Sequence, residues 1–424
     1  MDMRGITAAR IAALSLPLVV MTPVLAQEAA PGRTVKSLLD FARGDNPEFA
    51  AMRSEADASA ERVTPAGALA DPKFRVELRD ITRLGSQSPT LLPGQVGSTR
   101  YLLMQDVPWS GKRDLRREIA ALEAEGAKGR AAGTWVEVAA KIKAAQVRRQ
   151  TLYDAERLVQ EILDLTARLE QIAQARYAGG LAAQQDVIRA QIEQTGMRGE
   201  LVALQGEKRQ VDARLNALLA RPASAPLAEP DGPFPPPPDP FDQMALAERL
   251  RAANPSLFAE ESRIKAAEKG RDLAYRNRYP DFTFGLSPIQ SGGSVKEWEL
   301  MVELNIPLQQ DSRRAQERES GAMLAAARSR REALANQLLA DLAENLAAIE
   351  AARRSESLIA NSLLPQAESM FRAALAGYET GKADFSSVLD AQRHIRQARQ
   401  SRLQARSEAQ MRLTEIERLV GEAP

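Results

Sequence analysis

Arg176-Tyr177-Ala178-Gly179-Gly180 recurs about 200 residues later as Gly377-Tyr378-Glu379-Thr380-Gly381, and landmarks on either side of it recur as well. Asn46-Pro47, for example, returns as Asn254-Pro255 at a similar spacing. Several landmarks that match in one order indicate an internal duplication. The sequence therefore predicts a chain built from two copies of one unit.

The duplication divides the 424 residues into parts. We expect a first repeat over residues 27–220 and a second over 243–424. Between them, residues 221–242 are rich in proline, with Pro235–Pro238 at the centre. Proline-rich segments are extended and semi-rigid, so this segment is predicted to be a stiff linker.

Residues 1–26 have the pattern of a secretory signal peptide. Arg4 and Arg10 precede the apolar stretch Ile11–Val24, and Val24-Leu25-Ala26 fits a small-residue cleavage site. An N-terminal membrane anchor is the alternative, which the short, proline-containing apolar run disfavours. We therefore expect an exported protein.

The composition narrows the classes of function. A net charge of +1 gives no broad basic face, so nucleic acid is not an expected partner. The chain has no cysteine, which excludes disulfides and thiolate metal sites. Aromatic residues make up only 4% of the chain, and long stretches rich in Ala, Leu, Glu and Arg are typical of long helices.

Four segments alternate between apolar and polar residues, as strands do. In residues 297–306, for example, Trp298, Leu300 and Val302 share one face, with glutamates on the other. Glycine- and serine-rich connectors, Gly85–Gly97 and Ser287–Val295, join the strands into one hairpin per repeat. The predicted strands cover about 73–81, 99–107, 282–287 and 297–306.

The apolar strand faces carry aromatic residues at their ends, as lipid-facing strands do, although a soluble sheet with one wet face is the alternative. Four strands cannot close a barrel, and an eight-stranded barrel from two chains would be filled by side chains. Three chains give twelve strands and a lumen, so the pattern favours a trimer. The inward face would carry four basic and four acidic residues, and would not strongly select charge: Lys73, Arg75, Arg79 and Arg100 against Glu77, Glu297, Glu299 and Glu303.

Long helices follow each strand pair. Two helical hairpins are predicted, over 112–219 with its tip near 177–182 and over 312–420 with its tip near 378–383. The first arm of each is about 65 residues, or roughly 100 Å as one helix. Heptad spacing predicts a coiled-coil seam between the arms. Abundant alanine fits either a closed ring of helices or a solvated coiled coil. Shorter helices, Val35–Leu69 and Gln243–Tyr275, lead into the strands.

These landmarks resemble the TolC outer-membrane factor family. The matching residues include the Asn-Pro openings, Pro108–Arg113 after the second strand, and both glycine turns. The resemblance implies a fold that is mostly α with membrane β: a trimeric twelve-stranded outer-membrane β-barrel continued by a long α-helical barrel. It also implies a periplasmic adaptor protein, an inner-membrane pump and the export of small solutes. The Gly-Lys-Arg after the strand is most similar to the heavy-metal branch.

The resemblance also implies roles for single residues. Adaptor docking at the helix tips carries over to Arg176, Tyr177, Gly180, Leu181, Tyr378, Thr380 and Gly381. Asp390 occupies the family's pore constriction, whereas Ser387 replaces a carboxylate and Ala383 replaces a basic residue that locks some members. Asp186, near the first tip, is a further candidate pore charge.

We expect neither an enzyme nor a cofactor, because no catalytic motif appears and the single histidine, His394, lies between arginines on a helix. No histidine–carboxylate cluster has metal-ligand spacing either. The predicted function is an outer-membrane efflux duct, with metal cations as the expected cargo and drugs or other organic solutes as the alternative. A secreted coiled-coil structural or adhesion protein is the alternative from another class.

Overall fold

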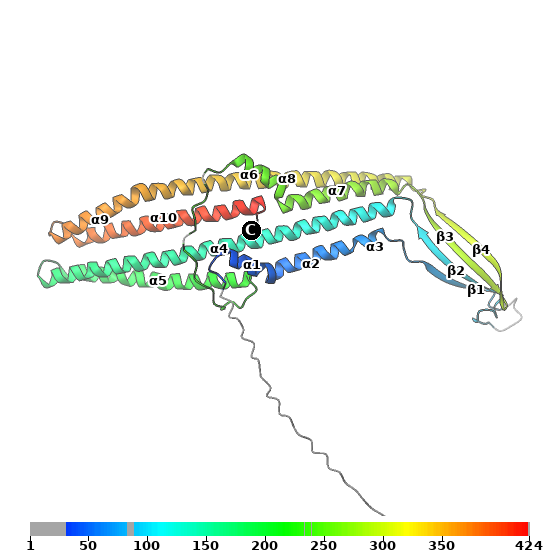
Figure 1. Cartoon of the computed structure of the whole chain (residues 1–424), viewed down its shortest axis with the longest axis horizontal. Coiled ribbons are helices and arrows are strands. Elements are labelled where there is room, and N and C mark those ends of the chain that lie inside the picture. Colours follow the sequence, from blue (N-terminus) through cyan, green and yellow to red (C-terminus); the bar gives the residue numbers. More distant parts are fainter. Residues whose placement is uncertain (1–30, 83–88, 233, 239, 423–424) are drawn as a thin grey trace, which may run out of the picture.

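The computed structural model describes residues 31–82, 89–232, 234–238 and 240–422. The predicted signal peptide, residues 1–26, lies outside the described residues. The molecule is long and thin, with a sheet at one end and helical tips at the other (Figure 1). The helices are α1 (Val35–Asp45), α2 (Pro47–Glu61), α3 (Val63–Gly67), α4 (Lys112–Ala178), α5 (Gln184–Leu218), α6 (Gln243–Ala253), α7 (Pro255–Arg276), α8 (Gln310–Leu358), α9 (Leu364–Glu379) and α10 (Phe385–Val420).

The four strands form one antiparallel sheet in the order β1-β2-β3-β4. Both copies therefore contribute to a continuous sheet, joined by the β2–β3 pair. Within each copy the strands are paired as a hairpin. Their bounds are β1 (Lys73–Arg79), β2 (Ser98–Val107), β3 (Asp281–Ser291) and β4 (Ser294–Asn305).

The expected loop at Ser287–Val295 is wrong, because β3 continues through it to Ser291. A two-residue turn with Gly292 at φ 67° then leads directly into β4. Pro288 suggested a loop, but it pairs with Trp298 just before a register shift at Ile289/Gln290. A strand tolerates proline next to such an irregularity, where the ladder is already interrupted.

The two faces of the sheet differ in polarity. Paired residues in an antiparallel sheet point to the same side, so the register places the large apolar side chains together on one face. On the other face, Arg100 lies 2.7 Å from Glu299 and 3.9 Å from Glu77, and donates to Ser287 at 3.0 Å. The exposed apolar residues are Phe74, Val76, Leu103, Phe284, Leu286, Trp298, Leu300, Val302 and Leu304.

The Asn-Pro pairs end one helix and start the next, so the continuous lead-in helices expected at Val35–Leu69 and Gln243–Tyr275 are wrong. Asn46 and Asn254 cap the helices that follow them, with proline at the first helical position. Each side-chain amide also donates to a carbonyl at the end of its own copy's return helix: Asn46 to Leu218 at 2.8 Å and Asn254 to Leu419 at 2.9 Å.

The helical layer has the order α5, α4, α10 and then α8 with α9 (Figure 1). The predicted seam is present in the first hairpin, where Ile162, Leu169 and Met197 are buried. The copies share their cores near the tips: Leu169 and Val187 of the first pack with Phe385 and Leu389 of the second. Each buried large aliphatic side chain stabilises this layer by about 1.5–3 kcal/mol.

The second hairpin is interrupted where the first is not. Instead of the single arm expected from residue 312 to the tip, α8 passes into a π-helical turn, η1 (Ile359–Leu363), before α9. Pro365 lies in the first turn of α9, where its missing N–H and bulky ring disfavour a regular α-helix. The extra residue of a π turn absorbs that conflict without breaking the rod.

Candidate functional site

Both tips end in the same backbone turn, which explains the repeated glycines. Gly180 and Gly381 have φ of 72° and 74°, a left-handed conformation that glycine adopts without strain. The amide of Leu181 donates to the carbonyl of Arg176 at 2.8 Å, and the second tip has the equivalent bond at 2.8 Å. These bonds satisfy the last carbonyls of α4 and α9, as in a Schellman motif.

A cluster of four side chains joins the two tips, and we call it the tip cluster: Arg176, Asp186, Tyr378 and Phe385. Tyr378 is only 4% exposed, and its ring packs against Phe385 with centroids 5.1 Å apart. The guanidinium carbon of Arg176 lies 4.8 Å from the Tyr378 ring centroid. A cation–π contact of this kind contributes about 0.5–2 kcal/mol.

Hydrogen bonds complete the tip cluster. The Tyr378 hydroxyl donates to the Asp186 carboxylate at 3.4 Å, and Arg176 donates to the carbonyl of Glu379 in the opposite tip. Burial, together with the nearby Asp186 charge, raises the pKa of Tyr378 above its ordinary value, because both disfavour a second negative charge. The hydroxyl therefore remains a donor at neutral pH, and the first tip is tied to the second.

The residues predicted to dock an adaptor divide into two groups. Tyr177 and Leu181 are exposed, Leu181 at 69%, and Gly180, Thr380 and Gly381 are exposed around them. The expectation for Tyr378 needs correction, because its buried ring is not available to a partner and instead holds the tips together. Arg176 likewise donates hydrogen bonds within the chain, to the carbonyls of Glu379 and Leu181.

The three candidate pore residues are also separated. Ser387 and Asp390 are exposed one turn apart on α10, whereas Asp186 is half-buried and accepts from Tyr378. Asp390 lies 3.3 Å from Arg393, whose other guanidinium nitrogen lies 2.8 Å from Glu193 of α5. The flanking carboxylates raise the pKa of Arg393. Asp390 is thus partly neutralised within its own chain.

Sequence reasoning missed a line of arginines along α10, which we call the arginine row: Arg393, Arg396, Arg399, Arg402 and Arg406. Its three tipward members reach carboxylates of the first copy. Arg393 lies 2.8 Å from Glu193, Arg396 3.3 Å from Glu200, and Arg399 3.1 Å from Glu161 and 3.8 Å from Glu368 of α9. The spacing of three and four residues was a visible signal for a shared face.

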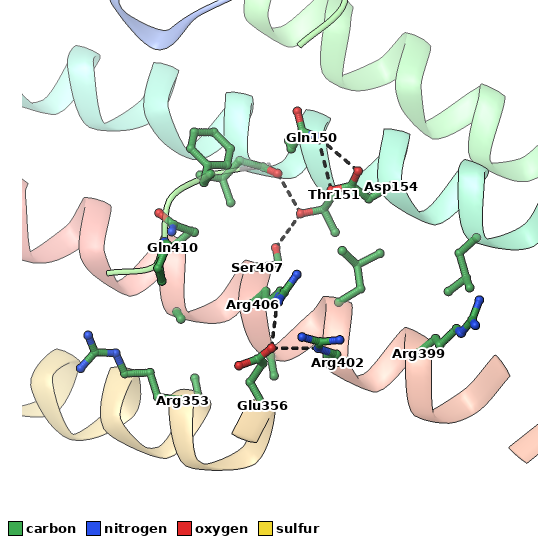
Figure 2. Close-up of a pocket in the computed structure, with 18 of the residues that line it drawn as sticks. Gln150, Thr151, Asp154, Arg353, Glu356, Arg399, Arg402, Arg406, Ser407 and Gln410 are labelled. Atoms are coloured by element: carbon green, nitrogen blue, oxygen red, sulfur yellow. Dashed lines mark hydrogen bonds and ion pairs between the residues drawn. The ribbon is translucent and has the colours of Figure 1, made fainter. Parts of the chain in front are cut away.

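The other two arginines of the row turn to the second copy's own α8. Arg402 and Arg406 lie 2.8 Å and 3.0 Å from the same oxygen of Glu356, as Figure 2 shows. Burial opposes ionisation of Glu356, but the hydrogen bonds from both arginines prevail and lower its pKa. The change of partner falls at the level of η1, between Glu356 and Glu368.

A groove of about 750 Å³ surrounds Glu356 and its two arginines, between α4, α8, α10 and the proline-rich linker (Figure 2). Phe234 and Pro236 of the linker cover one side. Gln410 of α10 donates to the carbonyl of Pro235 at 2.5 Å, and Arg353 of α8 donates to that of Pro237. The linker is therefore bound to the second copy's helices as a strap.

No helix among residues 31–422 that are described is long and apolar enough to cross a membrane. Within the same residues, no three potential His, Cys, Asp or Glu ligands come together around a point that could hold a metal ion.

The chain is similar to known proteins over nearly its whole length. The model of the family "Outer membrane efflux protein" matches residues 246–422. The cobalt-zinc-cadmium resistance protein CzcC of Cupriavidus metallidurans is 26% identical over 413 residues, which cover 95% of this chain and 93% of that protein.

Solved channels have the same fold. CusC superposes with a TM-score of 0.78 at 16% identity, covering 94% of this chain and 96% of that one. The outer membrane protein VceC of Vibrio cholerae superposes with a TM-score of 0.76 at 16% identity, covering 92% and 96%. These relatives are channels, not enzymes. The second half of the chain thus matches the outer membrane efflux protein family, and the whole chain is similar to proteins of the Gram-negative outer membrane that extend into the periplasm.

Proposed function

We propose that the chain is the outer-membrane duct of a tripartite efflux system that exports metal cations, and that it works as a homotrimer with a periplasmic adaptor protein and an inner-membrane pump. The observation that carries the proposal is the likeness to the cobalt-zinc-cadmium resistance protein over 95% of the chain. Drugs or other organic solutes remain the second candidate cargo, because at 26% identity the likeness to that protein does not fix what passes through this chain.

The sheet supports a shared barrel. Its outer strands β1 and β4 each have one edge without a partner strand within the described chain. Such an edge leaves backbone groups unpaired, which lipid does not tolerate. The exposed apolar face would meet lipid and the face with Arg100 would meet the lumen. Three chains would pair β4 with the next β1 and close twelve strands.

The tips support a gate. The tip cluster and the tipward arginine row hold the second hairpin against the first, whereas η1 gives the second hairpin a place to bend. Opening would separate Tyr378 from Asp186 and Arg393 from Glu193, and would carry the exposed α10 face with Ser387 and Asp390 outward. Exposed Tyr177 and Leu181 would meet the adaptor.

Removing the gene from its native host tests cargo. Growth should become sensitive to cobalt, zinc or cadmium, and a copy of the gene should restore resistance. Sensitivity confined to drugs or dyes would favour the organic-solute alternative. Normal growth of the deletion strain in metals and in drugs or dyes alike would contradict the efflux proposal itself.

Asp390→Ala tests the constriction. Three carboxylates converging in a narrow pore attract cations and obstruct passage, so the variant should raise the conductance of the closed trimer in planar bilayers and lower its cation preference. Ser387→Ala, one turn away and uncharged, is the matched control and should leave cation preference unchanged. Unaltered conductance in Asp390→Ala would place the narrowest ring elsewhere.

A further inference from the structure

The groove beside the proline-rich linker has no role in the proposed duct, although it has the dimensions of a ligand site. Its volume of about 750 Å³ lies within the range of small-molecule pockets, roughly 300–1,000 Å³. Its walls come from both copies, α4 from the first and α8, α9 and α10 from the second, with Phe234 and Pro236 of the linker along one side. Ligand sites commonly lie where separate units of a fold meet. The chemistry of the lining then decides what the groove would accept.

One carboxylate of the groove is shared by two arginines. The Nε atoms of Arg402 and Arg406 lie 2.8 Å and 3.0 Å from the same oxygen of Glu356, so the two guanidinium groups lie beside each other (Figure 2). Glu356 is ionised, but its single negative charge cannot balance two positive charges. Among the described residues, both guanidiniums hydrogen-bond to Glu356 through Nε alone. The terminal Nη atoms of both arginines are therefore available to a second acceptor.

The other acidic side chains in the described lining have arginines of their own. Asp154 lies 3.5 Å from Arg157, and Glu161 lies 3.1 Å from Arg399. Among these ion pairs, the excess positive charge therefore lies at the two arginines around Glu356. Their side chains are only 34% and 55% exposed, and partial shielding from water strengthens the attraction between opposite charges. This part of the groove favours an anion over a cation.

Apolar side chains complete the lining. Each helix contributes at least one, and the linker adds an aromatic ring: Leu158 of α4, Ala352 of α8, Leu364 of α9, Leu403 of α10 and Phe234. Removing apolar surface from water contributes about 25 cal/mol per Å², so a ligand with a hydrocarbon part gains by filling this volume. An inorganic ion has no such part, and would use only the charged portion of the groove.

We propose that this groove binds a small organic anion, in which a phosphate or carboxylate group is joined to an aromatic or short aliphatic part. The anionic group accepts hydrogen bonds from the Nη atoms of Arg402 and Arg406, since the planar guanidinium suits two oxygens at once. The apolar part packs against Leu403, Leu364 and the linker. Because the walls belong to both copies, an occupant also joins the copies and stabilises the folded chain. The site does not depend on what the duct exports.

Phenyl phosphate tests the site, because it joins a phosphate to one apolar ring and is soluble in water. Added to the purified full-length protein in an uncharged detergent, it should bind with a dissociation constant below about 1 mM, measured by phosphorus NMR, and should raise the Tm. Inorganic phosphate should bind more weakly. Phenethylamine, which has the ring and a positive charge, should not compete with phenyl phosphate. Absence of phenyl phosphate binding up to about 10 mM would overturn the inference.

Two substitutions in the charged part should change the affinity in opposite directions. Arg406→Gln should weaken phenyl phosphate binding about tenfold, because one of the two guanidiniums is lost while Arg402 still holds Glu356. Glu356→Gln should strengthen binding about threefold, because the competing negative charge is removed. Ion pairs that serve only to hold the helices together would give no such gain. Arg412→Gln, on α10 but outside the groove lining, is the matched control and should bind as the unmodified chain does.

Leu403→Asn tests the apolar part of the site. It should weaken phenyl phosphate binding several-fold, because the ring loses an apolar neighbour, and should leave the binding of inorganic phosphate unchanged. Thermal unfolding of each variant without a ligand checks that the fold is intact. Equal losses for both probes in a folded variant would contradict the proposed contact between Leu403 and the apolar part of the ligand.

The site and the duct can fail separately. A protein that conducts and confers resistance, but does not bind phenyl phosphate, would overturn the site alone. A protein that binds it as expected, but whose loss changes no resistance, would support the site and contradict the export function. Equal weakening by Arg406→Gln and Arg412→Gln would assign the binding to general positive charge on α10, and would overturn the inference.

Discussion

The two helical hairpins have the same tip turn and the same asparagine tether but differ in their first arms. In the first copy, α4 runs from Lys112 to Ala178 without interruption. In the second, the arm is divided by η1 into α8 and α9. The two copies therefore have one uninterrupted first arm and one that contains a π-helical turn, while their tips remain alike.

The arginine row shows what the interruption separates. Tipward of η1, Arg393 and Arg396 are paired with α5 of the first copy, whereas beyond it Arg402 and Arg406 are paired with Glu356 of their own hairpin. In the proposed gate, the segment tipward of η1 would therefore be held closed by contacts to the other copy, and the segment beyond η1 would be held by contacts within its own hairpin.

The largest expected effect concerns the asparagine tethers, of which each copy has one. Asn254→Ala should lower the free energy of unfolding by about 2–4 kcal/mol, because it removes a helix cap and leaves the Leu419 carbonyl unpaired. Asn46→Ala should cost about 1–3 kcal/mol, since Asn46 caps through one amide rather than two. Thermal or denaturant unfolding in detergent measures both. Losses below half a kilocalorie would show that the tethers do not stabilise the repeats.

The next largest effect is expected at the tipward end of the arginine row. Arg393→Gln removes the pairs to Glu193 and Asp390 and should raise the open probability of the trimer about two- to fivefold at low salt, the effect of about 1 kcal/mol. Arg402→Gln is the matched control, because Arg406 still holds Glu356, and it should change little. Salt near 1 M should abolish the difference by screening. Equal effects of the two variants would contradict the division at η1.

A smaller effect should follow pH at the tip cluster. The pKa of Tyr378 is raised in the folded chain, so its contribution is fully present below the ordinary tyrosine value of about 10 and is lost as pH rises above it. Alkaline pH should therefore loosen the tips, seen as rising conductance. Tyr378→Phe, which cannot ionise but keeps the ring, should remove that rise. A rise of the same size in the variant would assign it to another group.

The smallest effect should distinguish the arms themselves. Backbone amides in η1 should exchange with deuterium faster than those of α4 at the same distance from the tip, near Gln160. Pro365→Ala restores an N–H donor and should slow exchange there, bringing the second arm closer to the first. Unchanged exchange would mean that helix packing, rather than the proline, sets the π turn.

Local patterns predicted the repeat, the strands and the hairpins, because each depends on residues close in sequence. Alternation in residues 297–306 identified β4, although the glycines and Pro288 concealed how far β3 extends. The Asn-Pro breaks were predictable from the cap preference of asparagine and were overlooked. The first-copy partners of Arg393 and Arg399, Glu193 and Glu161, were not predictable, since they lie 200 and 238 residues away and depend on how the two hairpins pack. The same holds for the burial of Tyr378.

In each copy, the asparagine side chain near the start donates a hydrogen bond to a carbonyl at the end of the return helix: Asn46 to Leu218, and Asn254 to Leu419. Neither of these two bonds involves residues 221–242. A protease cut within that strap would therefore leave two halves that each keep their own tether and stay associated through α4 and α10. The covalent linker therefore keeps the two copies at one to one, and the fold of each copy does not depend on it.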